Sequence, residues 1–414
     1  MRVPARSRLS LGLVALAILL SHSAQAVTRT WTGAGADDNW TTAANWGGTA
    51  PVAGDDLVFP GGTPRLTPNN DFPPNTSFNS ITFNGGSGGY TLSGFAILLV
   101  GGISAANTAG NNTVQLPISL AASQTFSCTI PGPSDRLAIS GQVDLAGGFT
   151  LTLNSVSGSI IEMDGVISST GGVTSSGSGV VFIVANCTYI GPTNISAGDF
   201  VLAGSSLSTP SVVTVTGGLL QYANGASTGP VTATGGLVAC EGGGTSQIGN
   251  LTDLTLAAAA SLQMAMYSVT NYGQLNASGN VNLGGSNLII SFLFTSSTGN
   301  AFTIINKTSG GAVIGTFAGL PEGATFVSSG RTYQITYVGG DGNDVVITDI
   351  TQGGPTATPT TTPTLTPTPP PNVTPTPTPG PGPIATVPTL SPQLLALLGL
   401  ALALVAIFVI RKTS

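Results

Sequence analysis

Two acidic side chains in the middle of the chain have a spacing that could support glycoside hydrolysis. Glu162 and Asp164 are separated by one apolar residue, so on a β-strand both carboxylates would point to the same, outer face. Carboxyl groups about 6–7 Å apart fall within the range used by glycosidases. General acid catalysis would also need apolar surroundings that raise one pKa, and the sequence gathers no apolar side chains there. A solvated pair is therefore the prediction, and no residue is assigned a catalytic role.

The glycine-rich stretch 339–347 carries a second type of chemistry. It fits every fixed position of the calcium-binding nonapeptide, with Asp341 and Asp344 as the candidate ligands. Calcium takes about six to eight oxygen ligands, which such repeats supply from consecutive turns, and only one copy is present. The prediction is a tight turn into the last strand, with neither metal nor cofactor bound.

The chain has a single histidine, which excludes the classes of enzyme that need one for catalysis or for metal binding. The only one, His22, lies in a segment predicted below to be removed, so Ser-His-Asp or Cys-His catalysis and His-ligated zinc are excluded. A β-helix lyase would need an arginine beside clustered acids. The central arginines are far apart in sequence, and the adjacent pair Asp135–Arg136 is expected in a turn.

Three cysteines and three tryptophans complete the candidates. An odd number of cysteines leaves at least one unpaired, and burial as small apolar side chains is predicted for Cys128, Cys187 and Cys240. An aromatic sugar-binding platform is one interpretation of Trp31, Trp40 and Trp46. The stronger one is a cap that seals the open end of a repeat structure.

The composition indicates what must position these residues. Only 6% of the 414 residues are charged, against about 25% in an ordinary soluble domain, and 58 are glycine. The surface must therefore consist of Ser, Thr, Asn and Gly. The formal net charge is −6, and no cluster of cations faces a phosphate backbone, which excludes a nucleic-acid binder.

Residues 1–26 have the order of a secretory signal peptide. Basic residues at 2, 6 and 8 precede an apolar run, 9–20, and the small residues Ala24 and Ala26 then mark a cleavage site before Val27. The run is too short to cross a bilayer. Cleavage and export are therefore expected.

Residues 351–386 are rich in proline and threonine and contain no charged or aromatic side chain. Such a segment has nothing to bury, and polyproline II at about 3.1 Å per residue would extend it to roughly 110 Å. We expect a disordered or extended stalk.

Residues 387–414 form a tripartite tail. Leu394–Ile410 is apolar throughout, at the lower limit for a transmembrane helix, and a basic pair follows. Immediately before it stands a short motif: Val387, Pro388, Thr389, Leu390 and Ser391. This layout resembles the IPTL-CTERM sorting signal of Gram-negative bacteria. The resemblance implies a membrane-embedded sorting peptidase as partner and a transient or permanent single-span anchor, whereas a plain anchor is the simpler alternative.

Short strands separated by glycine turns repeat through residues 27–350. Val213–Leu220 recurs as Val231–Val238 at an offset of eighteen, Ile195–Leu202 has the same shape, and Leu275–Leu283 repeats it again. A period near 20 predicts an all-β, right-handed parallel β-helix with Val, Leu and Ile inside and Thr, Ser and Asn outside. A β-sandwich array is the competing architecture.

Three neighbouring stretches carry a more specific pattern: Gly165–Thr174, Ser178–Ile183 and Thr188–Gly204. Thr188-Tyr-Ile-Gly191 precedes Ala197-Gly-Asp-Phe-Val-Leu202, and this order resembles the autotransporter-associated β-strand repeat. In that family the two motifs mark successive β-helix coils of passenger domains. The resemblance implies cell-surface or secreted display and supplies no catalytic residue.

Together these patterns predict a non-enzymatic bacterial cell-surface or secreted β-helix protein with a role in adhesion, the extracellular matrix or the envelope. Glycans or other envelope components are the expected partners, with no nucleic acid. The alternative is a β-helix polysaccharide-active enzyme, either a lyase or a glycosidase, which would use Glu162 and Asp164.

Overall fold

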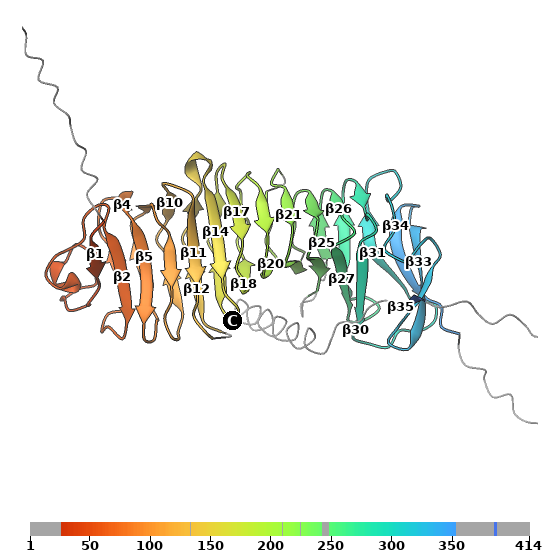
Figure 1. Cartoon of the computed structure of the whole chain (residues 1–414), viewed down its shortest axis with the longest axis horizontal. Helices are drawn as coiled ribbons and strands as arrows, with labels where there is room; N and C mark the ends of the chain where they lie inside the picture. Colours follow the sequence, from red (N-terminus) through yellow and green to blue (C-terminus); the bar gives the residue numbers. More distant parts are fainter. Residues whose placement is uncertain are drawn as a thin grey trace, which may run out of the picture.

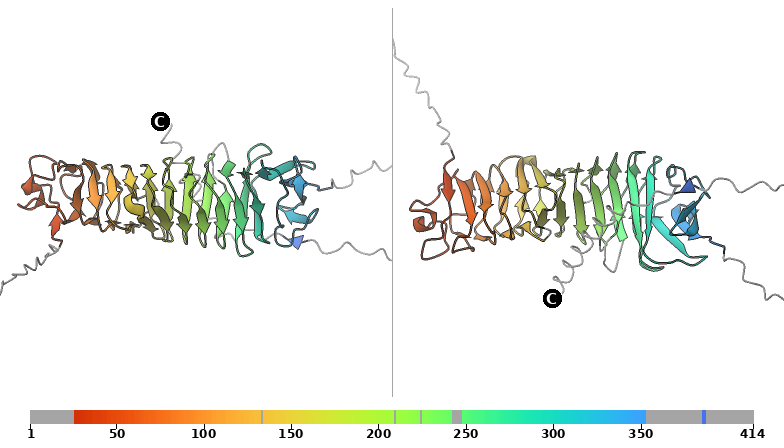
Figure 2. Two further views of the ribbon diagram at one scale, coloured as in Figure 1. Left: turned by 90° about the horizontal axis from the view of Figure 1, so that it is seen from above. Right: turned by 60° about the horizontal axis from the view of Figure 1, so that its bottom comes forward.

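The computed structural model describes residues 26–352, apart from 133, 209, 224 and 242–247, together with 385–386. Within these residues the chain winds as a right-handed parallel β-solenoid, a long rod whose coils follow one another in sequence order (Figure 1). Two further views show the same stack along its whole length (Figure 2). The predicted parallel β-helix is confirmed, and the β-sandwich alternative is wrong.

Two parallel sheets run along the rod. The twelve-stranded sheet consists of β1 (Thr28–Thr30), β2 (Asp56–Gly61), β5 (Ser80–Gly85), β8 (Ile103–Ala105), β11 (Gln124–Cys128), β14 (Thr150–Ser155), β17 (Gly172–Ser175), β19 (Thr193–Ile195), β21 (Val213–Val215), β23 (Val231–Ala233), β26 (Leu254–Leu256) and β29 (Val281–Asn282). The eleven-stranded sheet consists of β3 (Asn69–Asn70), β6 (Thr91–Gly94), β9 (Asn112–Val114), β12 (Arg136–Ile139), β15 (Ile160–Met163), β18 (Val180–Ile183), β20 (Asp199–Ala203), β22 (Leu219–Ala223), β24 (Leu237–Cys240), β27 (Ser261–Met266) and β30 (Asn287–Phe292).

The third side of the rod is divided between two further sheets. Near the N-terminus it is five-stranded, with β4 (Thr76–Phe78), β7 (Ile97–Leu99), β10 (Ile118–Leu120), β13 (Val143–Asp144) and β16 (Ile167–Ser168). A seven-stranded sheet completes the C-terminal end with β25 (Ile248–Leu251), β28 (Gln274–Ala277), β31 (Ala301–Lys307), β34 (Asp344–Asp349), β33 (Arg331–Gly339), β32 (Thr325–Ser328) and β35 (Ala385–Thr386). Between β16 and β25 isolated bridges such as Ser206↔Ser227 replace this side, so the coils there are short.

The sequence repeat corresponds to stacked coils. Val213 of β21 pairs with Val231 of β23, eighteen residues on. In the preceding coil Ile195 pairs with Val215. Along β21 the two valines are buried and Thr214 points outward, half-exposed. Apolar pairs therefore stack into continuous ladders inside the rod, because parallel in-register strands place like residues above one another.

One repeat assigned from the sequence lies at a different corner. Leu275 belongs to β28 on the third side, and the residue that pairs with Val231 in the next coil is Leu254. Residues 275–283 keep the predicted strand–turn–strand shape, as β28 and β29, but at another corner of the rod. Short strands beside glycine turns look alike on every side of the rod. The spacing between paired residues of successive coils varies from eighteen residues to the thirty that separate Leu275 from its partner Ile305.

Aromatic side chains close the N-terminal end. Trp31, Trp40 and Trp46 are buried, and the ring of Phe59 lies 5.6 to 6.1 Å from theirs. Trp46 comes from the short 3₁₀ helix η1 (Ala43–Trp46); a second such helix, η2 (Ala146–Gly148), lies in a later coil. The predicted cap is confirmed, and these indoles offer no exposed platform for a sugar.

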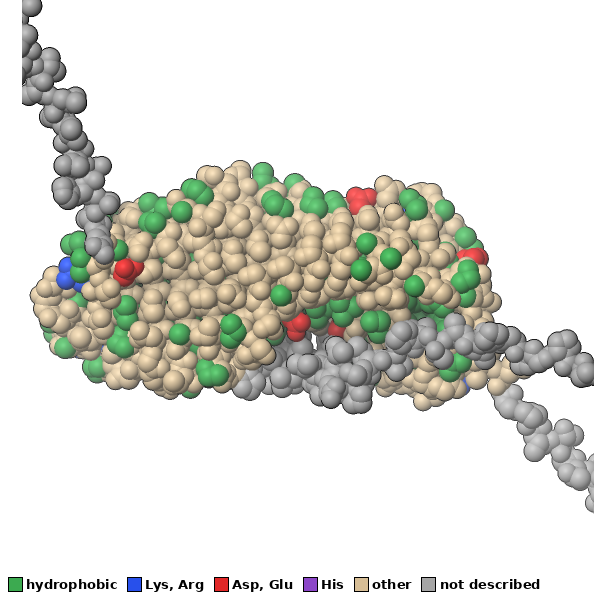
Figure 3. Space-filling view, viewed as in Figure 1, with side chains coloured by type: hydrophobic (Ala, Val, Ile, Leu, Met, Phe, Trp, Pro, Cys, Tyr) green, Lys and Arg blue, Asp and Glu red, His purple; other side chains and the backbone are tan. Residues whose placement is uncertain are grey.

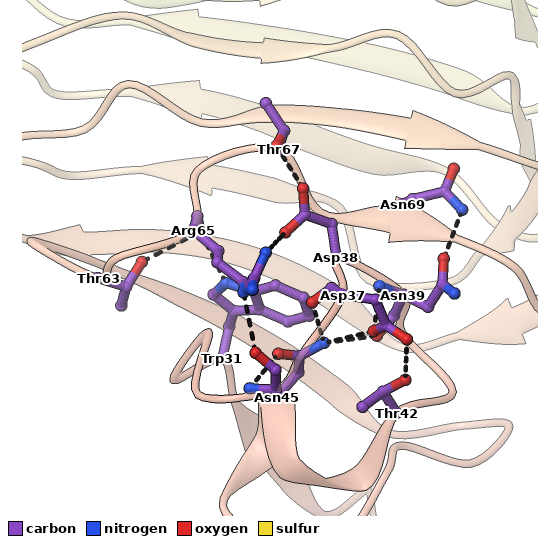
Figure 4. A network of polar contacts seen from close by, with 11 residues as sticks. Trp31, Asp37, Asp38, Asn39, Thr42, Asn45, Thr63, Arg65, Thr67 and Asn69 are labelled. Carbon is purple, nitrogen blue, oxygen red and sulfur yellow. Dashed lines mark hydrogen bonds and ion pairs between the residues drawn. The ribbon is translucent and has the colours of Figure 1, made fainter.

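Polar groups hold the loops over this cap in place (Figure 4). Arg65 Nη1 donates to Asp38 Oδ1 at 2.8 Å, and Asn45 donates to the backbone oxygens of Asp37 and Asn39. Hydrogen bonds from Thr67 and Arg65 lower the pKa of Asp38. Asp37 and Asp38 therefore stabilise the local structure of the cap.

All three cysteines are free and buried, as predicted. Cys128 ends β11 in the twelve-stranded sheet and Cys240 ends β24 in the eleven-stranded sheet, so they face the core from different sides. Burial raises the pKa of the Cys187 thiol to about 11. They are small apolar core residues and are not reactive thiols.

Antiparallel strands close the C-terminal end, where β34 pairs with both β31 and β33. Its last residue, Asp349, is buried and accepts hydrogen bonds from Arg331, Ser296 and the backbone N–H of Thr351. Burial alone would raise the pKa of Asp349, but these donors outweigh it and lower the pKa.

Replacing Asp349 with asparagine is expected to lower the midpoint of thermal unfolding by about 3 °C at pH 7. A carboxyl group whose pKa is lowered by folding stabilises the protein above its unfolded pKa, and this contribution disappears as the pH falls through the folded value. The difference between wild type and Asp349→Asn should therefore shrink below about pH 4. Calorimetry across pH checks this, with Asp341→Asn in an exposed turn as the control. A difference that does not change with pH would contradict it.

Two predicted terminal segments lie mostly or wholly outside the described residues. These are the signal peptide, of which only Ala26 is described, and the tail with its transmembrane helix 394–410. In the part of the chain that the structure describes, no helix has the length and apolar character needed to cross a bilayer.

Candidate functional site

The outer face of the eleven-stranded sheet carries the chemistry-bearing side chains. Glu162 of β15 points away from the core, in register with Ala138 on β12 and Phe182 on β18. It is only 3% exposed, whereas Asp164, just beyond the strand, is exposed. The prediction that both carboxylates are solvated is wrong for Glu162.

Glu162 is buried by apolar side chains that point outward from neighbouring strands. Ile160, Phe182 and Val201 form an apolar cluster outside the core, with Val180 and Val184 packed against it. Members of the cluster on different strands are 17 or more positions apart along the chain, and members on one strand alternate with core residues. Only the coil register brings them onto one face beside Glu162.

Arg136 joins this cluster from the preceding strand. Its Nη1 lies 2.8 Å from Glu162 Oε2, so the expected turn pair with Asp135 is wrong. Burial, together with the negative charge of Asp164, outweighs this cation and raises the pKa of Glu162 to about 7. The cluster therefore contains a carboxyl group that can hold or release a proton near neutral pH, beside a fixed positive charge.

A second polar group lies further along the same face. Gln263 Nε2 donates to Glu241 Oε2 at 2.7 Å, and Gln221 Nε2 donates to the backbone oxygen of Glu241 at 2.7 Å. All three residues are at most 1% exposed, and one side-chain oxygen of each accepts no hydrogen bond. Burial raises the pKa of Glu241 to about 7. In the sequence these residues give no signal, because isolated polar side chains between apolar ones resemble ordinary outward positions of a strand.

The nonapeptide stretch forms the turn between β33 and β34, as predicted. Asp344 Oδ1 accepts the backbone N–H of Lys307 at 2.9 Å, and Asp341 is exposed. Beside it the ammonium of Lys307 donates to the backbone oxygens of Ser309, Gly310 and Gly311 at 2.7 to 3.0 Å. The loop oxygens beside the nonapeptide turn thus accept hydrogen bonds from the ammonium group of Lys307.

Over the described ranges, no three His, Cys, Asp or Glu side chains lie close enough together to hold a metal ion. The sorting motif Val387–Ser391 and Ala24 of the cleavage site lie outside the described residues. No family model, curated protein or solved structure matches the chain. The fold and the outer face are therefore the basis for any functional proposal.

Proposed function

We propose that this chain is a non-enzymatic, exported bacterial β-solenoid that acts in adhesion or in the extracellular matrix or envelope. The observation that carries the proposal is the rod itself, whose visible surface consists mostly of uncharged polar side chains and backbone with very few charges (Figure 3). Such a surface favours contact with polyhydroxylated or other neutral envelope material through hydrogen bonds. The buried ion pair of Glu162 with Arg136 also favours a structural role for the acids.

The termini fit this proposal. A signal peptide at 1–26 would direct export, the proline- and threonine-rich stalk 351–386 would hold the rod 27–350 away from a membrane, and the tail 387–414 would engage a sorting peptidase. The resemblance to autotransporter-associated repeats and to the IPTL-CTERM signal supports surface display or release.

A second candidate function rests on one observation. Glu162, with a pKa of about 7, lies beside Asp164 and Arg136, which is the kind of environment that tunes a general acid. A polysaccharide lyase or glycosidase is the corresponding alternative.

Protein purified from the surface fraction is expected to bind cells or matrix of the producing organism and to release no reducing sugar from a glycan panel. Binding is measured by solid-phase assay and release by reducing-end chemistry. Sugar release that is lost in the Glu162→Gln/Asp164→Asn variant and kept in Asp341→Asn would overturn the non-enzymatic proposal and support the enzyme. Failure to bind cells, matrix or any glycan would overturn the adhesive role.

A further inference from the structure

Part of the outer face of the eleven-stranded sheet is enclosed although it lies outside the core. Val201, Gln221 and Ala239, from three successive strands, are at most 1% exposed. Toward either end of the rod the same face opens, because Thr113 on β9 and Ile289 on β30 are half-exposed. On the twelve-stranded sheet the outward Asn194 is exposed. Enclosure is thus confined to the region from β12 to β27, called here the outer patch.

No described element forms a second layer over the outer patch. Its apolar residues Ile160, Phe182 and Val201 form a cluster separate from the core, and their described apolar neighbours come from β18 and its end. In Figures 1 and 2 the coloured strands form a single wall on this side. Segment 242–247, which is not described, has no apolar side chain with which to cover it.

We infer that the outer patch binds the apolar C-terminal segment 394–410 of the same chain. Seventeen residues in a helix would span about 26 Å. The outer patch extends over the six strand spacings from β27 to β12, about 29 Å at 4.8 Å each. The segment is therefore long enough to cover most of the enclosed region, from β27 to β15.

The path of the chain places this segment within reach. β35 (Ala385–Thr386) pairs with β32, and β32 contacts β30, the strand next to β27. The eight residue steps from Thr386 to Leu394 can cover up to about 26 Å. A helix that starts there and runs back along the patch ends near β15.

The charged side chains favour a segment that runs from β27 toward β15. Each described basic side chain already has a partner: Arg29 with Asp55, Arg65 with Asp38, Arg136 with Glu162, Arg331 with Asp349, and Lys307 with loop oxygens. Arg411 and Lys412, directly after the apolar segment, would reach the β15 end of the patch. There they would face the exposed carboxylate of Asp164 and the raised-pKa carboxyl group of Glu162.

The polar residues of the patch make this binding reversible. Apolar side chains cannot donate hydrogen bonds to the free side-chain oxygens of Gln221, Glu241 and Gln263, and burying an oxygen without a donor is unfavourable. A bilayer imposes no such cost on the apolar segment. The solenoid would therefore shield the segment in water and give it up to a membrane, a role beyond the proposed surface function and independent of it.

Thiol labelling of the full chain tests the inference. The chain is synthesised without membranes, the three native cysteines are buried, and a single new cysteine is placed at Val201 or, as a matched control in the same coil, at Asn194. Val201→Cys is expected to react with a maleimide at least tenfold more slowly than Asn194→Cys. Adding the substitutions Leu398→Asp and Val405→Asp should bring the two rates together, with circular dichroism confirming that the solenoid is folded.

A second measurement adds phospholipid vesicles to the Val201→Cys chain that keeps the native Leu398 and Val405. Labelling of Val201→Cys should then accelerate because the segment transfers to the bilayer. Equal rates for the two cysteines in membrane-free solution would overturn the inference. So would protection that persists in the Leu398→Asp/Val405→Asp variant, or protection that depends on protein concentration, which would identify a second copy of the chain as the cover.

Discussion

Replacing Gly165 with alanine is expected to lower the free energy of unfolding of the solenoid by about 3 kcal/mol. Gly165 lies at the corner between β15 and β16, and a Cβ atom there would stand 2.0 Å from the backbone oxygen of Gly141 in the preceding coil. Gly141 in turn stacks on Leu116, where a Cβ would lie 2.1 Å from the backbone oxygen. At this corner the backbones of successive coils are therefore in direct contact, with no side chain between them.

The clash cannot be relieved by rotating a side chain. The strands on both sides of the corner are hydrogen-bonded to the preceding coil, and β15 also pairs with β18 of the next coil. The N–H of Gly165 itself donates to the backbone oxygen of Ile139 at 2.9 Å. Separating two coils at one corner would break these bonds, and a rod made of coils that contact only their neighbours has no other contacts to compensate.

Chemical denaturation followed by circular dichroism measures the effect. Gly86→Ala is the matched control, because a Cβ at Gly86 meets no atom within 4 Å and its backbone angle is one that alanine adopts. The control should change the free energy of unfolding by less than about 0.5 kcal/mol. Equal stability of the two variants would mean that the coils at Gly165 are not stacked as described.

Replacing Pro388 and Thr389 with alanine is expected to abolish most of the surface form of the protein and to leave an uncut form in the inner membrane. If Val387–Ser391 is a processing signal, the apolar segment 394–410 holds the chain in the membrane only until a peptidase cuts near the motif. The basic pair Arg411 and Lys412, directly after the apolar segment, is a minimal retention signal for a membrane-spanning helix. Mature surface protein should therefore lack Leu394–Ser414.

Cell fractionation and mass spectrometry of the C-terminal peptide give the readout. The variant Pro377→Ala/Thr378→Ala makes the same change within the stalk and should be processed like the wild type. Recovery of the intact C-terminal peptide from wild-type surface material would contradict the sorting proposal, and a single-span anchor would then be the correct account. Neither result affects the test of the outer patch, which is made without the peptidase.

Much of the architecture could be predicted because it depends on short-range patterns. Alternation in segments such as Val213-Thr214-Val215, with glycine turns between them, predicts strands that bury one face. The recurrence of that pattern at Val231 predicts stacked coils, and the structure pairs these residues. The tryptophans at 31, 40 and 46 could be interpreted as a cap because an open core end must be covered by large apolar side chains.

The outer patch could not be predicted in the same way. The exposure of Glu162 depends on the cluster that contains Phe182 and Val201. Its ion-pair partner, Arg136, belongs to the neighbouring strand β12 of the preceding coil. Coil lengths between eighteen and thirty residues decide which residues become neighbours. A change of one residue in a corner loop would move a side chain to the other face of the sheet.

Composition and local alternation by themselves determined that this protein is a rod of short parallel strands with an apolar interior and an almost uncharged exterior, because both are properties of each coil alone. Tertiary structure alone decided which outward residues become neighbours. It paired Arg136 with Glu162, raised the pKa of that carboxyl group to about 7, and enclosed Gln221 and Gln263 with unpaired oxygens. These effects arise from charges and burial on adjacent coils, and the register between coils exists only once the chain has wound.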